Sequence, residues 1–432
     1  MMNWHLPVSS DDPIGQLSPQ SWLEDPATQE VWAALTAKGG EVRFVGGCVR
    51  DAVLNRPVKD IDLATPYTPE TVLGLLAARG IKTLTTGIAH GTIAAIHHGH
   101  SFEITTLRRD VETDGRHARV AFTHSWREDA ARRDFTINTL SADLNGRIWD
   151  PFDGLADLGG RRVRFVGDAE TRIEEDILRI LRFFRFNAHY GLGAPDRQGL
   201  DACRKLAPRL VELSAERVAA ELLRLLEATD PSPIVTVMYA EGIFDPILPE
   251  IEHPDRLKML VWLESRALIR PHIAPDPLRR LAALLPPDRS KALAVGESLH
   301  FSNAQIKRLS LIAAGWVRAT PDLSIKEMRR LLHRLGPDLM RDRVLVAWSD
   351  ERRIHDISSS TETARWVSLF DQIDLWQPVE FPLRGQDALD LGCPPGPTIG
   401  TMLDQIELWW EESDYQPDHT ACLDRLKSIL TP

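Results

Sequence analysis

The chain has 432 residues, of which 43% are hydrophobic and 26% are charged. This length favours several structural units over one small module, and the apolar content excludes a wholly disordered chain. No apolar run approaches the roughly 18 residues that span a bilayer, and the first residues have neither the basic nor the apolar region of a secretory signal, so we expect a cytoplasmic protein without a membrane partner. The four cysteines stand far apart without a CxxC pair, which predicts reduced, packed thiols and argues against a zinc ribbon or a disulfide framework.

The charge balance is acidic, because 51 Lys and Arg against 62 Asp and Glu leave a net charge of -11. Such a balance argues against a phosphate-rich partner unless the basic residues are segregated. They are partly segregated, into residues 161–185 and residues 326–343. Two interpretations stay open: a phosphate-binding face, or a solvated helix face that neighbouring acids balance.

The chain divides into two regions with different predicted secondary structure. Between Glu41 and Asp153, short β-rich runs alternate with helical stretches, which predicts a small α/β or α+β unit. The runs are EVRFVG, DIDLAT, GTIAAI, SFEITTL and RIWDPF. The remainder of the chain has a helical pattern, so we expect an all-α body after this unit.

The helical part begins with RIEEDILRILRFFRF, where an apolar stripe predicts one amphipathic helix. The stripe consists of Ile173, Ile177, Ile180 and Phe184. A second amphipathic helix, AERVAAELLRLLE, follows Ser214 as a candidate cap. Ser324 and Glu327 have the spacing of a capping box, and the last helices follow the breaks GCPPGP and QPD.

Three carboxylates are candidates for a metal site. Asp60 and Asp62 alternate with apolar residues in KDIDLAT, so both project from one face of a strand. Glu103 in SFEITTL lies in another predicted strand and could line the same site. Carboxylate oxygens suit Mg²⁺, which keeps part of its shell for water and phosphate. The alternative is a solvated strand edge, since an acid-x-acid triplet alone is common.

A glycine turn precedes these acids. EVRFVGG reads as a buried strand that ends in Gly46 and Gly47, and CVRDAVLN reads as the start of a helix. Glycine lets backbone N–H groups approach an anion, and Arg50 could then reach a phosphate. Glycine pairs also occur as plain turns.

Two arginine-rich segments follow. In RRDFTIN, Arg133 accompanies Asp134 and Asn138, which lie one helical turn apart and so face the same way. In EEDILRILRFFRF a polar edge runs beside the apolar stripe; it consists of Glu175, Asp176, Arg179, Arg182 and Arg185. Ion pairing within the helix is the plain interpretation of this edge. In the functional one, a carboxylate accepts from the exocyclic amine of cytosine or adenine while a guanidinium donates to the adjacent ring acceptor, which selects C and A over U and G.

The order of motifs GGCVRD, DID, FEITTLRRD, RRDFTIN and EEDILRILRFFRF resembles the bacterial class II tRNA nucleotidyltransferase (CCA-adding enzyme) and poly(A) polymerase family of the DNA polymerase β superfamily. The similarity covers residues 28–240, and PLRGQDALDLGCPPGPTIG fits the helical tail more loosely. The resemblance implies an α+β fold, in which a small N-terminal nucleotidyltransferase head with a mixed β-sheet precedes an elongated all-α neck, body and tail. It divides the chain into an extension (1–27), a head (28–153), a neck and RNA-binding helical domain (154–240), and a body and tail (241–432).

The resemblance also implies roles. Asp60 and Asp62 would hold Mg²⁺, with Glu103 as the third acid. Contacts to the nucleotide would come from Gly46, Gly47, Arg50, Arg133, Asp134 and Asn138. The base would be read by Asp176 and Arg179 with Glu175, while Arg182 and Arg185 steady the reader or touch triphosphate. We expect a loop from Arg109 to Arg119, which resembles the flexible element linked to the switch from CTP to ATP.

The partners implied are tRNA, CTP and ATP, with in-line attack of the tRNA 3′-hydroxyl on the α-phosphate and two metal ions. Poly(A) polymerases of the family carry an arginine-rich element before the third acid and a basic tail, and this chain has GIAHGTIAAIHHGHSFEITT and no basic tail. Both departures favour tRNA end maturation. A poly(A) polymerase, an enzyme that adds only C or only A, and an RNA-binding protein without catalysis are the alternatives.

Overall fold

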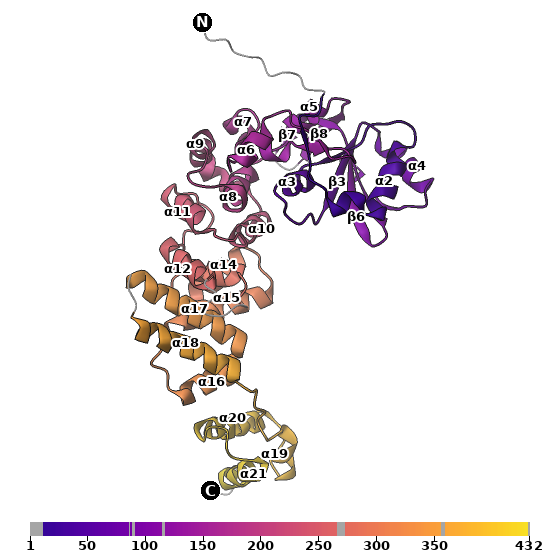
Figure 1. Cartoon of the computed structure of the whole chain (residues 1–432). Coiled ribbons are helices and arrows are strands. Elements are labelled where there is room, and N and C mark those ends of the chain that lie inside the picture. Colours follow the sequence, from indigo (N-terminus) through magenta and orange to yellow (C-terminus); the bar gives the residue numbers. More distant parts are fainter. Residues whose placement is uncertain are drawn as a thin grey trace. The chain divides into compact units, whose positions relative to one another are not determined.

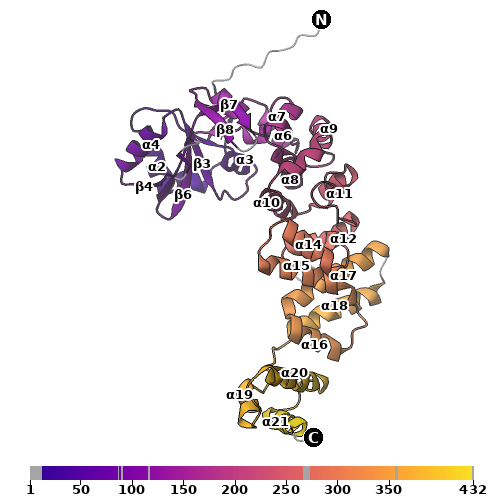
Figure 2. The ribbon, with the colours of Figure 1, turned by 180° about the vertical axis from the view of Figure 1, so that it is seen from behind.

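The computed structural model describes residues 12–85, 87–88, 91–114, 117–265, 273–355 and 359–430, without the side chains of 110–120. Its contacts separate the chain into two compact units, 1–249 and 250–432 (Figure 1). The first unit contains all the strands described, and the second is helical (Figure 2). The predicted α+β class, with a mixed sheet followed by helices, is therefore confirmed. The finer four-part division of the chain stays a prediction.

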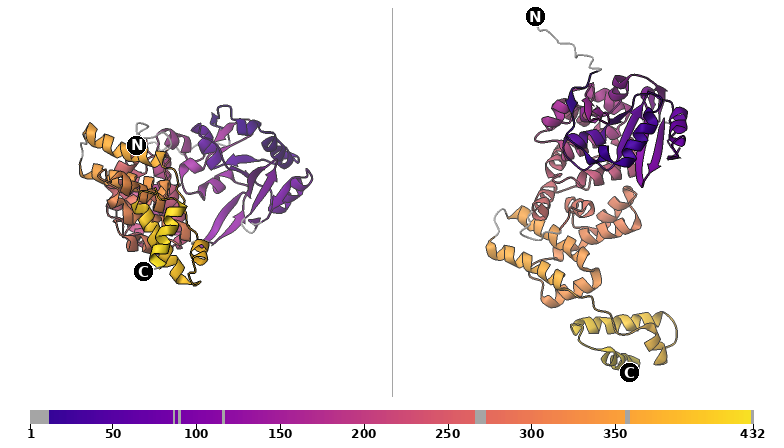
Figure 3. Two further views of the ribbon diagram at one scale, coloured as in Figure 1. Left: turned by 90° about the horizontal axis from the view of Figure 1, so that it is seen from below. Right: turned by 45° about the vertical axis from the view of Figure 1, so that its right-hand side comes forward.

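The first unit is built on an eight-stranded mixed sheet, seen from two further sides in Figure 3. Its strands in spatial order are β1 (Gly15–Gln16), β10 (Arg147–Trp149), β9 (Ser141–Ala142), β2 (Arg43–Val45), β3 (Ile61–Thr65), β6 (His100–Thr106), β5 (Thr92–His97) and β4 (Lys82–Leu84). Neighbours run antiparallel except β3 and β6, which are parallel. Alternation sets the faces as expected, since Phe102 and Ile104 are buried while Glu103 between them is exposed.

Helices α2, α3 and α4 accompany the sheet. Helix α2 (Pro26–Thr36) is capped by Asp25, and helix α4 (Pro69–Ala77) is capped by Thr68. The two helices contact each other, and α4 also packs against β4 and β5. Helix α3 (Gly47–Val53) follows β2 directly and packs against β2 and β3. This strand-turn-helix unit places the glycine turn at the end of β2.

The segment that resembles a flexible element has regular backbone structure. Strands β7 (Arg108–Asp114) and β8 (His117–Phe122) form a two-stranded antiparallel sheet with a register shift between Asp110 and Glu112. The expectation of a loop is therefore wrong for the backbone. Residues 115–116 and the side chains of 110–120 lie outside the described residues, so the role of this segment in the switch stays a prediction.

The neck contains a correction to the predicted helix. The segment forms two helices, α7 (Ala169–Glu175) and α8 (Leu178–Tyr190), because Asp176 is extended with φ -156° and ψ 107°. The Asp176 carboxylate accepts a hydrogen bond from the backbone N–H of Leu178 (3.2 Å), the first residue of α8. The apolar stripe is nevertheless buried throughout, at Ile173, Ile177, Ile180 and Phe184. The stripe therefore stays buried across the break, and the Glu175 carboxylate at the end of α7 still pairs with Arg179 on α8.

Short helices join these elements in the first unit. They are α1 (Ser21–Glu24), α5 (Trp126–Ala131), the 3₁₀ turn η2 (Thr136–Asn138), α6 (Gly154–Gly159), α9 (Arg197–Leu206), η3 (Ala207–Glu212), α10 (Ala215–Leu226) and α11 (Ser232–Ala240). Ser214 precedes α10 as expected, but its side chain makes no capping hydrogen bond. Helix α8 packs against α10 and α11. The aromatic core there is formed by phenylalanines that directly precede η2, that lie between α6 and α7, and that belong to α8: Phe135, Phe165, Phe183 and Phe186.

The second unit consists of α12 (Pro254–Ser265), α13 (Pro277–Leu284), α14 (Arg289–Ser298), α15 (Asn303–Gly315), η4 (Trp316–Arg318), α16 (Ile325–Leu335), α17 (Pro337–Ile354), α18 (Ser360–Leu375), α19 (Gly385–Asp390), α20 (Pro397–Glu412) and α21 (His419–Leu430). The predicted capping box of Ser324 and Glu327 is present at the start of α16. The last three helices share a core around Ile406, Trp410 and Leu426. None of the helices described is long and apolar enough to cross a membrane.

Candidate active site

Two of the three predicted acids lie on strands β3 and β6, and the third directly precedes β3. Asp62 and Glu103 are register partners in the parallel pair, and Asp60 is exposed just before β3. Burial and the negative charges of Glu103 and Asp60 together raise the pKa of Asp62 to about 6, although the nearby Arg133 opposes the rise. The carboxylates therefore repel one another at a site where a bound cation would relieve the repulsion.

The glycine turn is fixed by backbone shape and by a close neighbour. Gly46 has φ +71°, and a Cβ atom there would lie 2.8 Å from Nη1 of Arg133. Any side chain would therefore be strained and would push the guanidinium away. Gly47 begins α3, which carries Arg50. The glycine turn after β2 thus leaves room for the guanidinium of Arg133 to lie close to the backbone.

A hydrogen-bonded chain of buried polar groups continues from Arg50. Its Nη1 donates to Oδ1 of Asn138 (2.6 Å), and Nδ2 of Asn138 donates to Oδ1 of Asp134 (2.8 Å). Nε of Arg182 donates to Oδ2 of Asp134 (2.8 Å). The predicted meeting of Asp134 and Asn138 is confirmed, although Asn138 ends a 3₁₀ turn that begins after Asp134, and the two residues do not share an α-helix. Burial alone would raise the pKa of Asp134, but Arg182 and Asn138 outweigh burial and lower it, so this carboxylate is ionised.

The chain of contacts extends to a residue that sequence reasoning missed. Glu221 on α10 is 3% exposed and accepts from Nε of Arg185 (2.6 Å). Nη1 of Arg182 lies 3.8 Å from the same carboxylate. Glu221 therefore supports both arginines of α8. Its position in AERVAAELLRLLE gave no local signal, since a glutamate on an amphipathic helix is ordinarily solvated.

The predicted base-reading residues have partners within the chain. Glu175 pairs with Arg172 and Arg179, which bears out the plain interpretation of ion pairing on this edge. The carboxylate of Asp176 instead accepts hydrogen bonds from Nη2 of Arg217 on α10, which lies 3.0 Å and 2.9 Å from its two oxygens. Arg217 was also missed, because 41 residues separate it from Asp176. A sequence pattern is local, whereas this contact exists only once α10 packs on α8.

A cavity of about 500 Å³ lies over these groups. It is lined by Gly46, Gly47, Arg50, Arg132, Arg133, Asp134, Asn138, Asp176, Leu178, Arg179, Arg182, Phe186 and Arg217. Six arginines and two aspartates give the lining a positive charge. Among the predicted residues, the lining does not include Asp60, Asp62, Glu103, Glu175 and Arg185. Arg133 connects the two parts, since it lines the cavity and acts electrostatically on Asp62.

The two arginine-rich segments are largely paired. In the first, arginines bind Asp134, Asp157, Glu175 and Glu221. In the second, Arg329, Arg330, Arg334 and Arg341 pair with acids of the second unit. Neighbouring acids thus balance the arginines of both segments. In the first segment, some of these arginines also line the cavity.

Comparison with known proteins agrees with the predicted family. A model described as the Poly A polymerase head domain matches residues 42–164, and one described as a probable RNA and SrmB- binding site of polymerase A matches residues 195–253. The mitochondrial CCA tRNA nucleotidyltransferase 1 of Danio rerio is 34% identical, covering 89% of this chain and 87% of that protein. The CCA-adding enzyme of Streptococcus pyogenes serotype M5 (strain Manfredo) is 32% identical, covering 91% and 94% respectively.

The fold has a solved counterpart. The Bacillus stearothermophilus CCA-adding enzyme, crystallised in complex with CTP, aligns with a TM-score of 0.74 at 24% identity, over 94% of this chain and 98% of that chain. The expected cytoplasmic location stays a prediction, because the relatives include mitochondrial and bacterial proteins. Identity above 30% over most of both chains, together with the head-domain match, establishes that the chain belongs to the family of CCA-adding tRNA nucleotidyltransferases that share the poly(A) polymerase head domain.

Proposed function

We propose that the chain adds C, C and A to the 3′ end of tRNA, using CTP and ATP and releasing pyrophosphate. The observation that carries the proposal is the pairing of three acids on the strands of the head with a neighbouring cavity whose charged lining is mostly arginine. Relatives named as a CCA tRNA nucleotidyltransferase and as a CCA-adding enzyme match 89% and 91% of the chain and support the same activity.

Membership of a nucleotidyltransferase family implies the use of a divalent metal ion, and we assign Mg²⁺ to Asp60 and Asp62 with Glu103 as the third acid. All three offer the hard oxygen donors that Mg²⁺ prefers. The raised pKa of Asp62, caused by burial and by the charges of Glu103 and Asp60, fits a site that a cation completes. When bound, the metal would supply Lewis-acid stabilisation of charge on the phosphates and on the attacking oxygen.

The arginines of the cavity would bind the triphosphate. Arg50 and Arg182 are held in place through Asn138 and Asp134, so little ordering remains when the nucleotide enters. The 3′-hydroxyl oxygen of the tRNA forms a bond to the α-phosphorus while the bond to the pyrophosphate oxygen opposite breaks. Fixed guanidinium groups oppose the negative charge that leaves with the pyrophosphate. No covalent bond to the protein is required.

Base choice would fall to Asp176 and Arg179 at the break between α7 and α8. The Asp176 carboxylate can accept from the amine of cytosine or adenine, and the Arg179 guanidinium can donate to the neighbouring ring nitrogen. Uracil and guanine present the opposite polarity at these positions. Arg217 occupies the Asp176 carboxylate, and both line the cavity, so Arg217 would have to share or release the carboxylate when a base arrives.

The test is incorporation from CTP alone, from ATP alone and from both, with Mg²⁺, on tRNA transcripts that end before CCA, after the first C, and after CC. Growth to a complete CCA end that then stops is the expected result. Long A tails would indicate a poly(A) polymerase, and addition of only C or only A would indicate a specialist. Absence of incorporation on every transcript would indicate an RNA-binding protein without catalytic activity.

Variants separate catalysis from binding. Asp62→Ala should lose incorporation by about three orders of magnitude or more and keep its affinity for tRNA, because it removes a metal ligand and spares the basic faces. Asp201→Asn, an exposed acid on α9, is the control and should act like the parent. Full activity of Asp62→Ala would show that Asp62 is not a ligand of the catalytic metal ion. Asp176→Ala should admit UTP, and unchanged selectivity would move base reading to other residues.

A further inference from the structure

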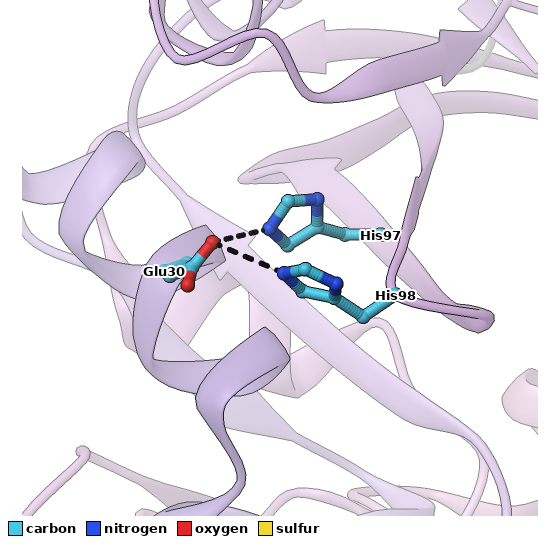
Figure 4. A group of neighbouring side chains, drawn as sticks. All are labelled: Glu30, His97 and His98. Carbon is cyan, nitrogen blue, oxygen red and sulfur yellow. Dashed lines mark hydrogen bonds and ion pairs between the residues drawn. The ribbon is translucent and has the colours of Figure 1, made fainter.

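A second cluster of ligand-type side chains lies at the turn between strands β5 and β6. His97 ends β5, His98 occupies the turn that follows, and Glu30 faces them from α2 (Figure 4). Oε2 of Glu30 lies 2.6 Å from Nε2 of His97 and 3.5 Å from Nε2 of His98. Nothing in the proposed transfer reaction uses these groups.

The turn brings two consecutive side chains to the same carboxylate. Successive residues of a strand normally point to opposite faces. Here His98 has φ +45° and Gly99 has φ +80°, so the strands are joined by a two-residue turn in which both residues are left-handed. Asn is the favoured non-glycine residue at the first of these positions, and a histidine there holds a strained backbone. The unusual residue at this position is the one whose ring is directed at Glu30 (Figure 4).

The donor atoms are spaced for a single ion. One atom from each of the three side chains can be chosen so that all lie within 4.8 Å of one another, and no other group of three His, Cys, Asp or Glu in the described part of the chain meets this condition. With bond lengths near 2.0–2.1 Å, the ligands of a tetrahedral Zn²⁺ lie roughly 3.3 Å apart, so small side-chain rotations suffice.

We propose that Glu30, His97 and His98 form a surface site for a divalent transition metal of the zinc class. Two imidazole nitrogens and one carboxylate oxygen suit Zn²⁺ and are a poor match for Mg²⁺, which prefers oxygen ligands. Each ring binds as neutral imidazole with its proton on Nδ1, and the fourth position is left for water. The ion joins helix α2 to the β5–β6 hairpin, which are 67 residues apart along the chain, and so stabilises the folded head.

The proposal is tested by titrating the full chain, free of any affinity tag, with ZnCl₂ in calorimetry and in thermal unfolding. Mg²⁺ is present in excess so that the acids of β3 and β6 are not open to zinc. The expected result is one equivalent of Zn²⁺ per chain and a Tm that rises with zinc concentration. A chain that binds no Zn²⁺ under these conditions would overturn the proposal.

Three variants locate the ion. Glu30→Gln and His98→Asn should each weaken zinc binding at least about ten-fold and abolish the rise in Tm. His98→Asn suits the left-handed turn, so in EDTA its Tm should equal or exceed that of the parent, which verifies folding. His300→Asn is the matched control, because His300 is exposed and has φ +51° but lies outside the cluster. Zinc binding by Glu30→Gln and His98→Asn equal to that of His300→Asn would place the ion elsewhere and refute the site.

Discussion

Asp134 joins the head to the neck of the first unit, and its replacement by asparagine is the sharpest test of the buried polar chain. The side chain is 8% exposed. Its carboxylate accepts from Arg182, from Asn138 and from the backbone N–H of Phe135. Asp134→Asn keeps the size of the side chain, removes the charge, and replaces one acceptor by a donor group. Arg182 is then left without its closest carboxylate.

The magnitude follows from burial. Breaking one side of a fully buried ion pair costs about 3–5 kcal/mol. Arg182 is less buried than this, with its side chain 30% exposed, and Glu221 lies 3.8 Å from it. We therefore expect Asp134→Asn to destabilise the first unit by about 2–3 kcal/mol, below the fully buried range.

Hydrogen exchange of the α8 amides measures this loss within the first unit, with amides of α17 as an internal reference in the second. The control Asp201→Asn removes an exposed partner of Arg204 on α9, and it should cost about 0.5 kcal/mol or less. Equal protection of α8 in the two variants would refute the reasoning, because burial of the pair would then have no energetic consequence.

The same pair predicts a pH dependence. The pKa of Asp134 is lowered in the folded protein, since Arg182 and Asn138 outweigh the effect of burial. Its stabilising contribution is therefore complete above the ordinary aspartate pKa and is lost as pH falls through the lowered value. The parent and Asp134→Asn should differ in the protection of the α8 amides, after correction for intrinsic exchange rates. This difference in protection should be constant near neutral pH and should become smaller in acid. A difference that widens in acid would contradict the assigned sign.

Three further outcomes are expected. Arg217→Ala should leave Asp176 without its fixed partner and reduce discrimination between CTP and UTP about ten-fold, or about 1.4 kcal/mol, measured as the ratio of kcat/KM values; an unchanged ratio would show that Arg217 does not position Asp176. Gly46→Ala should strain the backbone by about 1–2 kcal/mol and displace Arg133, so that incorporation falls at least ten-fold, whereas parental activity would mean that the guanidinium can move freely. Burial raises the pKa of Cys48 to about 12, so its thiol should resist iodoacetamide at pH 8 until the protein is unfolded in urea, and rapid labelling of the folded chain, read by mass spectrometry, would contradict this packing.

Local patterns in the sequence determined much of the candidate site. Alternation in DIDLAT and SFEITTL placed Asp62 and Glu103 on one face of neighbouring strands, because successive residues of a strand point to opposite faces. The glycine pair marked the turn before α3, and the apolar stripe identified the buried face of the neck. The spacing of Asp134 and Asn138 predicted their contact, although the turn between them is 3₁₀.

Other features were decided only by tertiary structure. The two-residue strands β1 and β9 carry too few residues for a periodic signal and form because partners are present on the sheet. The sequence pattern is continuous and helical, but the chain leaves the helix at Asp176. The carboxylate of Asp176 then accepts hydrogen bonds from Arg217. Periodicity is set by neighbours along the chain, and it determines which face of an element is buried. The partners of a buried charge come from distant segments, so they are fixed only when helices and strands pack together.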